Sequence, residues 1–176
     1  MANQIVWAPP FDNSFGNDMV YRVFSAAGNP YAVGFEELQS QQALTNKGIN
    51  LNKAMPQFRF PQSGVWAIVF DEIDLVTLSF NNFQHRQLPG CAGGRVLFNV
   101  ASIINEHYTV SNAGAYVFSA APDKSHTRKT DLTGIYNGLL GLSGRKSKIL
   151  GSFPGWDCYS DFLAGGRGYV ITTQSY

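Results

Sequence analysis

The chain has 176 residues and a formal net charge of +1, from 13 Lys and Arg and 12 Asp and Glu residues. Charged residues make up 14% of it, against about 25% in a typical soluble domain, and aromatic residues make up another 14%. This balance argues against a general nucleic-acid binder, which needs a basic excess to contact phosphates. It also argues against a disordered chain, which would be rich in charge and poor in aromatic residues. The length fits one domain, so we expect residues 1–176 to form a single domain.

The expected location follows from what the sequence lacks. Gly, Pro and Asn interrupt the apolar stretches before the ~18 residues that a membrane span needs. Residues Met1–Trp7 show no basic region followed by an apolar run, so we expect no signal peptide. Cys91 and Cys158 give neither a disulfide framework nor a metal-ligand spacing. We therefore expect reduced thiols, no metal and a cytoplasmic protein, in the host cytoplasm if the source is a virus.

The first 57 residues predict one strand pair and a polar connector. Residues 1–18 look irregular, since two consecutive prolines break any regular element there. Residues 21–24 and 31–35 are β-prone and flank a turn that contains Gly and Pro. Residues 36–57 are mostly polar, with a helical turn or two before Gly48.

The clearest β signal lies in the next 20 residues or so. Residues 64–70 form a nearly continuous apolar run, which is typical of a central strand buried on both faces. Asp71–Asp74 reads as an acidic turn, and residues 75–80 alternate as a second strand. Two apolar runs joined by a short turn predict a hairpin.

Helical periodicity begins after a polar loop. The first apolar stripe at helical spacing consists of Val96, Leu97, Val100, Ile103, Ile104, His107 and Tyr108. A strand over residues 115–120 follows. The second helical stripe consists of Leu132, Ile135, Tyr136, Leu139 and Leu140. Residues 156–162 and 169–173 then predict two final strands.

The element order β-β-β-β-α-β-α-β-β predicts the α+β class, with a single mixed, mostly antiparallel central sheet and two main helices. Strands on either side of a crossover helix run parallel. We therefore expect residues 75–80 and 115–120, which flank the first helix, to be parallel neighbours.

Over residues 21–173 this order resembles the GNAT acyltransferase fold. In that family the loop after the fourth strand carries a Q/R-x-x-G-x-G/A motif, whose amides hold the pyrophosphate of coenzyme A. The segment Gln87-Leu88-Pro89-Gly90-Cys91-Ala92 stands at this place, directly before the helix. Gly93-Gly94-Arg95 offers an anion nest one turn later. The alternative is a loop that simply leads into the helix.

The resemblance also implies a catalytic tyrosine and an opening in the sheet. A family tyrosine on the helix after the fifth strand protonates the departing thiolate of coenzyme A, and Tyr136 in Ile135-Tyr136-Asn137-Gly138-Leu139 resembles it. The fourth and fifth strands of the family separate at one end to admit the pantetheine arm. From the residues alone, Tyr136 is equally one more member of its apolar stripe.

The general base of many family members is missing from its place, because residues 75–80 contain no carboxylate. Other candidate bases are His85, Glu106 and His107.

A strand with Phe-Ser-Ala, a basic Thr-Arg-Lys and a tyrosine on the next helix also resemble small GNAT-like proteins of bacteriophages. Such proteins often lack a defined activity, so a catalytically silent member is an open alternative.

The basic residues are distributed unevenly. Six of the 13 lie within 25 residues, namely Lys124, Arg128, Lys129, Arg145, Lys146 and Lys148. This excess suits a small anionic ligand or an acidic partner, and it adds Arg128 to the expected cofactor-binding residues. A solvated helix face with a polar loop explains it equally well.

Two functions therefore stay open. The first is an acyl-coenzyme A binding protein that transfers the acyl group, for instance from acetyl-coenzyme A, to an amine. The second is a non-catalytic interaction protein on the same scaffold, such as a viral inhibitor of a host or defence protein.

Overall fold

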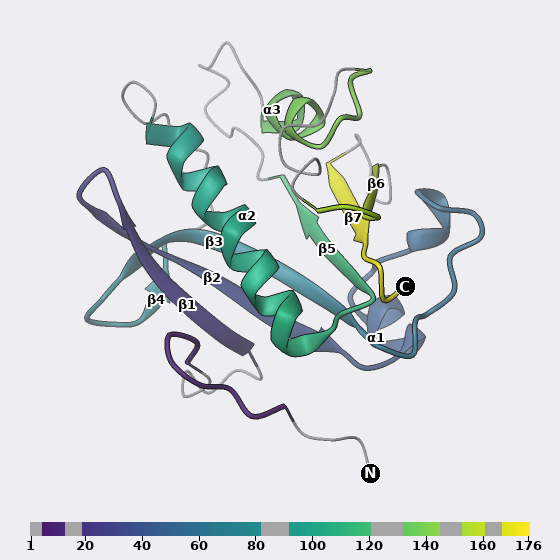
Figure 1. Ribbon diagram of the computed structural model, residues 1–176, viewed down its shortest axis with the longest axis horizontal. Helices are drawn as coiled ribbons and strands as arrows, with labels where there is room; N and C mark the ends of the chain where they lie inside the picture. Colours follow the sequence, from purple (N-terminus) through teal and green to yellow (C-terminus); the bar gives the residue numbers. More distant parts are fainter. Residues whose placement is uncertain (1–4, 13–18, 82–91, 121–131, 145–152, 161–166) are drawn as a thin grey trace. The chain divides into compact units, whose positions relative to one another are not determined.

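The computed structural model describes residues 5–12, 19–81, 92–120, 132–144, 153–160 and 167–176. Its helices and strands follow one another in the order β1 (Met19–Ala26), β2 (Asn29–Leu38), α1 (Gln41–Asn46), the 3-10 helix η1 (Leu51–Lys53), β3 (Val65–Asp74), β4 (Ser79–Phe80), α2 (Ala92–Ser111), β5 (Ala115–Ser119), α3 (Leu132–Leu139), β6 (Asp157–Ser160) and β7 (Gly168–Thr172). The strands form one mixed, mostly antiparallel sheet in the order β1-β2-β3-β5-β7-β6, with β4 paired to β3 off this path (Figure 1). The expected α+β class with two main helices, α2 and α3, is confirmed.

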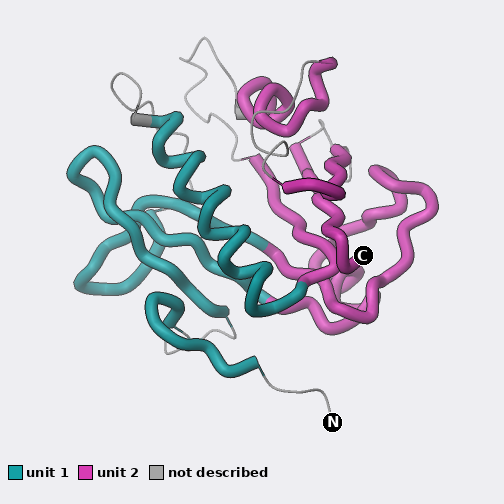
Figure 2. Tube along the Cα trace, viewed as in Figure 1, with its two compact units in different colours: residues 1–36, 68–112 teal, residues 37–67, 113–176 magenta. Residues whose placement is uncertain are grey.

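The chain divides into two compact units (Figure 2). The first unit consists of residues 1–36 and 68–112, and the second of residues 37–67 and 113–176. No helix in the described part of the chain is long and apolar enough to cross a membrane.

The first unit is built on the β1–β2 hairpin and on α2. The two strands pair from Met19 opposite Glu36 to Ala26 opposite Asn29. Ala27 and Gly28 between them both have positive φ, which is the conformation of a tight two-residue hairpin turn. Helix α2 lies along one face of these strands (Figure 1). Its buried positions repeat at helical spacing and consist of Val96, Val100, Ala101, Ile103 and His107.

The second unit has its own apolar core. Helix α1 begins at Ser40, whose side chain accepts a hydrogen bond from the Ala43 amide at 3.1 Å and so caps the helix. The helix and the turn after it bury Leu44 and Leu51 completely. The core cluster consists of Leu38, Leu44, Leu51, Phe58, Val65, Ala115, Val117 and Val170. The polar connector expected from the sequence is therefore a segment that covers one side of the sheet.

Two expectations about the middle of the sheet are wrong. Asp71–Asp74 is not a turn, because β3 continues to Asp74 and the chain reverses over the four residues that follow. The Asp74 carboxylate accepts the Val76 and Thr77 amides at 2.7 and 3.1 Å, and this side-chain turn ends the strand. In addition, the parallel neighbour of β5 is β3 and not residues 75–80, of which only β4 is strand.

The parallel ladder between β3 and β5 is short. It joins Val65 to Ala115, Trp66 to Tyr116 and Ala67 to Val117, all in the second unit. On its other side, β5 pairs with β7 along its whole length, from Ala115 to Ser119. Within the described ranges, the last two residues of β5 thus have a strand partner on the β7 side but not on the β3 side.

Candidate functional site

The expected coenzyme-binding residues fall partly within the described chain. Ala92, Gly93, Gly94 and Arg95 form the start of α2. The other members of that set, Gln87, Gly90, Cys91 and Arg128, lie outside the described residues. The same holds for the whole basic group, Lys124, Arg128, Lys129, Arg145, Lys146 and Lys148.

The start of α2 has the properties of an anion-binding helix end. Gly93, Gly94 and Arg95 are helical, so they present the unpaired amides of a first turn and not the loop nest that the sequence suggested. A Cβ atom built at Gly93 or Gly94 would meet nothing within 4 Å among the described residues, so no side chain of that part crowds the main chain there. The Arg95 side chain is exposed. Together these features favour contact with a phosphate.

Tyr136 lies on α3 in the second unit and is buried. Its ring packs edge-on against Phe118 of β5 and Tyr169 of β7, with centroid distances of 5.8 and 5.7 Å. Burial raises the pKa of Tyr136 above its ordinary value, and the neighbouring Tyr169 raises it further. The hydroxyl group therefore keeps its proton at any physiological pH. Because Phe118 is near the end of β5, Tyr136 lies where β5 no longer pairs with β3.

A polar network beside Tyr136 could not be identified from the sequence. Tyr169 is completely buried, and its hydroxyl donates towards Asn137 Oδ1 at 2.9 Å and the Thr133 carbonyl at 3.2 Å. Asn137 follows Tyr136 on α3, so the network fixes the face that the helix turns towards β7. The only signal in the sequence was the polar Asn137 beside the apolar stripe.

The candidate bases in the described chain are both engaged in contacts. Glu106 on α2 forms an ion pair with Arg22 on β1. His107 is completely buried, and burial lowers its pKa from 6.5 to about 3, so the imidazole is neutral at pH 7. His85, the third candidate, lies outside the described residues. His107 is therefore closed to a substrate amine in solution, and the Glu106 carboxylate is already paired with Arg22.

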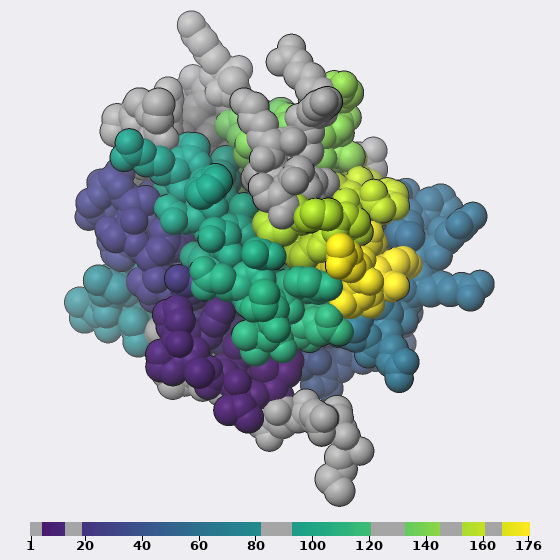
Figure 3. Space-filling model, viewed as in Figure 1, coloured from purple at the N-terminus to yellow at the C-terminus, as the bar shows by residue number. Residues whose placement is uncertain are grey.

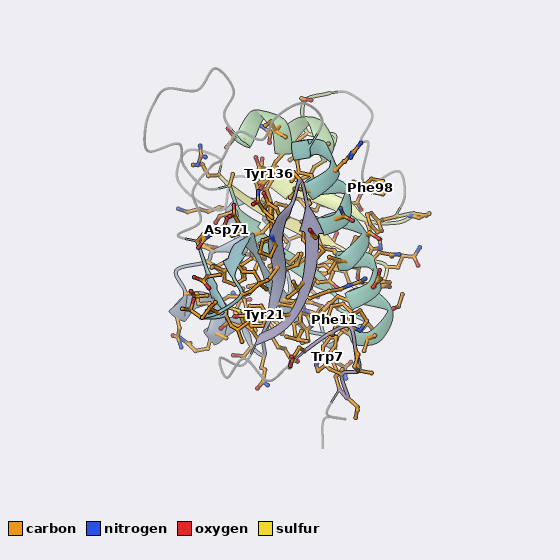
Figure 4. All side chains as sticks on the ribbon, turned by 90° about the vertical axis from the view of Figure 1, so that its left-hand side faces the viewer. Trp7, Phe11, Tyr21, Asp71, Phe98 and Tyr136 are labelled. Carbon is orange, nitrogen blue, oxygen red and sulfur yellow. The ribbon has the colours of Figure 1, made fainter. Side chains whose placement is uncertain are left out.

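His107 instead organises an aromatic cluster in the first unit. Its ring stacks on Phe35 and on Trp7, with centroid distances of 3.9 and 5.0 Å. Phe11 completes the cluster, and Figure 4 shows Trp7 and Phe11 together at the end of α2. In the space-filling view the N-terminal residues lie beside this part of α2 (Figure 3). Of these two N-terminal aromatic residues, Phe11 is thus a core residue and Trp7 is half-buried.

No group of three or more His, Cys, Asp or Glu side chains in the described ranges is arranged to hold a metal ion. Comparison with protein-family models, with curated proteins and with solved structures finds no match to this chain.

Proposed function

We propose that the chain binds an acyl-coenzyme A and transfers its acyl group to an amine. The observation that carries the proposal is the short parallel ladder between β3 and β5. In the GNAT fold, which the element order resembles, the two parallel strands separate at one end to admit the pantetheine arm. Here β5 shares three residue pairs with β3 but five with β7. A ladder along the whole of β5 would have used the main-chain groups that such an arm needs.

The end of β5 supplies groups that suit this ligand. Main-chain N–H and C=O groups alternate in direction along a strand. Of the two residues Phe118 and Ser119, one therefore points its N–H and C=O groups away from β7. The pantetheine arm contains two amides, which need main-chain partners of this kind. We place the arm along this edge of the second unit. Considered by itself, the start of α2 in the first unit suits a phosphate at Gly93 and Gly94.

Tyr136 takes the role of the acid in this proposal. The amine attacks the thioester carbonyl, the C–N bond forms, and the C–S bond breaks with its electron pair on sulfur. The thiolate then takes the Tyr136 proton, and the proton that the attacking nitrogen loses on forming the amide passes to water and restores the Tyr136 hydroxyl. The raised pKa keeps the proton on the Tyr136 hydroxyl at neutral pH but also makes it a weaker acid, so the transfer depends on a thiolate whose pKa is raised by the same apolar surroundings. Burial has the same effect on a thiol of this chain, because it raises the pKa of Cys158 to about 12.

Thermal unfolding with acetyl-coenzyme A tests the binding step. A ligand at 100 times its dissociation constant stabilises the folded chain by about 2.7 kcal/mol. Gly93→Asp should abolish this gain without loss of stability, because a carboxylate favours a helix N-terminus but repels a phosphate. Gly134→Asp is the matched control, since it places the same charge in the first turn of α3, also in open space. Unchanged unfolding of the wild-type chain at millimolar acetyl-coenzyme A would refute the proposal.

Release of free thiol from acetyl-coenzyme A tests the chemical step. Tyr136→Phe should lower turnover with an amine acceptor while acetyl-coenzyme A still stabilises the variant. Equal turnover in the variant and the wild-type chain would remove Tyr136 from the mechanism. A cytoplasmic location, where acyl-coenzyme A is made and consumed, goes with this function.

A second candidate function is supported by a different observation. Glu106, His107 and Tyr136 are all engaged in an ion pair or in aromatic packing. In the described part of the chain, these candidates for proton transfer stabilise the fold. This arrangement suits a non-catalytic interaction protein on the same scaffold. This candidate predicts a folded chain that acetyl-coenzyme A does not stabilise at all.

A further inference from the structure

The β3–β4 hairpin ends in an apolar tip. We define the hairpin tip as residues Asp74–Ser79. Within it, Leu75, Val76 and Leu78 expose 59%, 93% and 52% of their surface. Turns usually carry Gly, Pro, Asn, Asp or Ser, so three exposed aliphatic side chains in six residues are an unusual choice.

The hairpin tip is held in one shape by its own hydrogen bonds. Asp74 Oδ1 accepts from the Val76 and Thr77 amides, and the Thr77 and Ser79 hydroxyl oxygens are 2.7 Å apart. Leu78 has a φ of 52°, a left-handed conformation that a residue with a Cβ atom adopts only at a cost in energy. Glycine or asparagine would fit that position better. An exposed leucine in a disfavoured conformation points to a role in contacts with another molecule.

A complementary surface lies on the outer face of α2. We define the α2 patch as Arg95 and Phe98, which are three positions apart and so lie side by side on the helix. Both side chains are exposed, and Phe98 exposes 73% of its surface. Among the residues that the structure describes, Arg95 forms no ion pair and Phe98 no ring contact. The patch therefore offers an apolar ring and a cation together.

The two surfaces lie at opposite sides of the first unit. Figure 4 shows Phe98 on α2 at one side and Asp71, on the strand that leads to the hairpin tip, at the other, with β1 and β2 between them. The hairpin tip and the α2 patch of one chain therefore do not meet, whereas those of two chains can.

We propose that the hairpin tip of one copy docks on the α2 patch of a second copy. The aliphatic side chains of the tip cover the Phe98 ring, and the Asp74 carboxylate faces the Arg95 guanidinium. Because the two surfaces differ, the contact is head-to-tail and leaves each end of a pair free for another copy. A net charge of +1 offers little repulsion between copies. The absence of Lys and Arg from residues 60–85 speaks against an anionic lipid surface as the occupant.

Sedimentation and light scattering over a range of protein concentrations test this contact. The wild-type mass should rise with concentration beyond that of a dimer and fall with added salt. Val76→Asp and Phe98→Ser should each weaken association by about tenfold or more, because each removes the centre of one surface. Val110→Asp is the matched control, since it makes the same change at an exposed valine near the other end of α2.

Mixing the two weakened variants gives the sharpest result. Val76→Asp keeps an intact α2 patch, and Phe98→Ser keeps an intact hairpin tip, so the mixture should form a 1:1 dimer and nothing larger. Circular dichroism and thermal unfolding verify that both variants are folded, and Leu75→Ser with Arg95→Glu is a second pair. A wild-type chain that stays monomeric, a mass that stops at a dimer, or a mixture that stays monomeric would each overturn the proposal.

Discussion

The imidazole of His107 lies almost parallel to the phenyl ring of Phe35, with 3.9 Å between the ring centroids and 11° between the planes. Trp7 stacks on the same imidazole, so one side chain joins the N-terminal segment, β2 and α2. A Ser111 hydroxyl lies 3.1 Å from His107 Nδ1, one turn further along the helix. The polar side chain of His107 is thus used as an aromatic core residue that also contacts the Ser111 hydroxyl.

The burial of His107 predicts a loss of stability in acid. Its pKa falls from 6.5 to about 3 on folding, so in that range the unfolded chain binds a proton that the folded chain does not. The contribution of His107 to the free energy of unfolding is therefore complete above about pH 6.5 and falls as the pH drops towards 3. His107→Phe should remove a slope of up to about 1.4 kcal/mol per pH unit. Urea unfolding at several pH values measures it.

The comparison of the two chains isolates His107, because carboxylates that titrate in the same range contribute equally to both. At pH 8 the imidazole is neutral in the folded and unfolded states, so any difference there reports packing and the lost Ser111 contact. Equal slopes below pH 6.5 would show that His107 is protonated in the folded chain.

The hydroxyl of Tyr169 predicts a measurable coupling to Asn137. Removal of the hydroxyl by Tyr169→Phe should lower the free energy of unfolding by about 1 kcal/mol, since it leaves the half-buried Asn137 amide oxygen without its donor. Asn137→Ala should cost a similar amount, and the double variant should cost less than the sum. Urea unfolding of the four chains gives the coupling energy. Tyr159→Phe on β6 is the control, since the Tyr159 hydroxyl makes no such bond within the described residues. Losses of unfolding free energy that simply add in the double variant would contradict the network.

Periodicity predicted the helices and most of the strands well. The first stripe, from Val96 to Tyr108, falls within α2, and the second falls largely within α3. These elements were predictable because each must turn one apolar face towards the sheet, and that requirement leaves a pattern in the sequence. The same logic placed Tyr136 on the buried stripe, where the structure has it.

Tertiary contacts decided what the sequence left undetermined. The acidic run Asp71–Asp74 resembled a turn, but Asp74 alone makes the turn, through its side chain and the amides that follow. Composition cannot distinguish a carboxylate that accepts amides two and three residues on from one that faces solvent. The choice of β3 as the neighbour of β5 likewise depends on long-range pairing that no local pattern records. The pairing of Glu106 with Arg22 is equally non-local.

The close approach at Gly114 predicts a strong effect of a single methyl group. A Cβ atom there would lie 2.5 Å from Pro61 Cβ and 2.5 Å from Ser63 Oγ, and the proline ring has little freedom to move away. The Gly114 amide also donates to the Gly64 carbonyl at 3.0 Å, which holds the two segments together. Gly114→Ala should therefore lower the free energy of unfolding by about 1–3 kcal/mol. Thermal or urea unfolding measures the loss.

The matched control for this substitution is Gly134→Ala on α3. A Cβ atom at Gly134 would meet nothing within 4 Å, and alanine favours a helix over glycine by up to about 1 kcal/mol. The same chemical change should thus stabilise at one position and destabilise at the other. A stable Gly114→Ala chain would mean that the 61–63 segment can move away from β5.

The half-buried thiol of Cys158 predicts slow alkylation of the folded chain. Burial raises its pKa to about 12, and only the thiolate reacts with iodoacetamide. At pH 8 the thiolate fraction is smaller than that of an ordinary cysteine by about a thousandfold, so the folded chain should react slower by a similar factor. A Cys91→Ser chain leaves Cys158 as the single thiol, and mass spectrometry follows its modification with time. In urea the same thiol should react at the ordinary rate, because unfolding returns it to water. Fast modification of the folded chain without urea would show that the thiol is open to solvent and that its pKa is not raised.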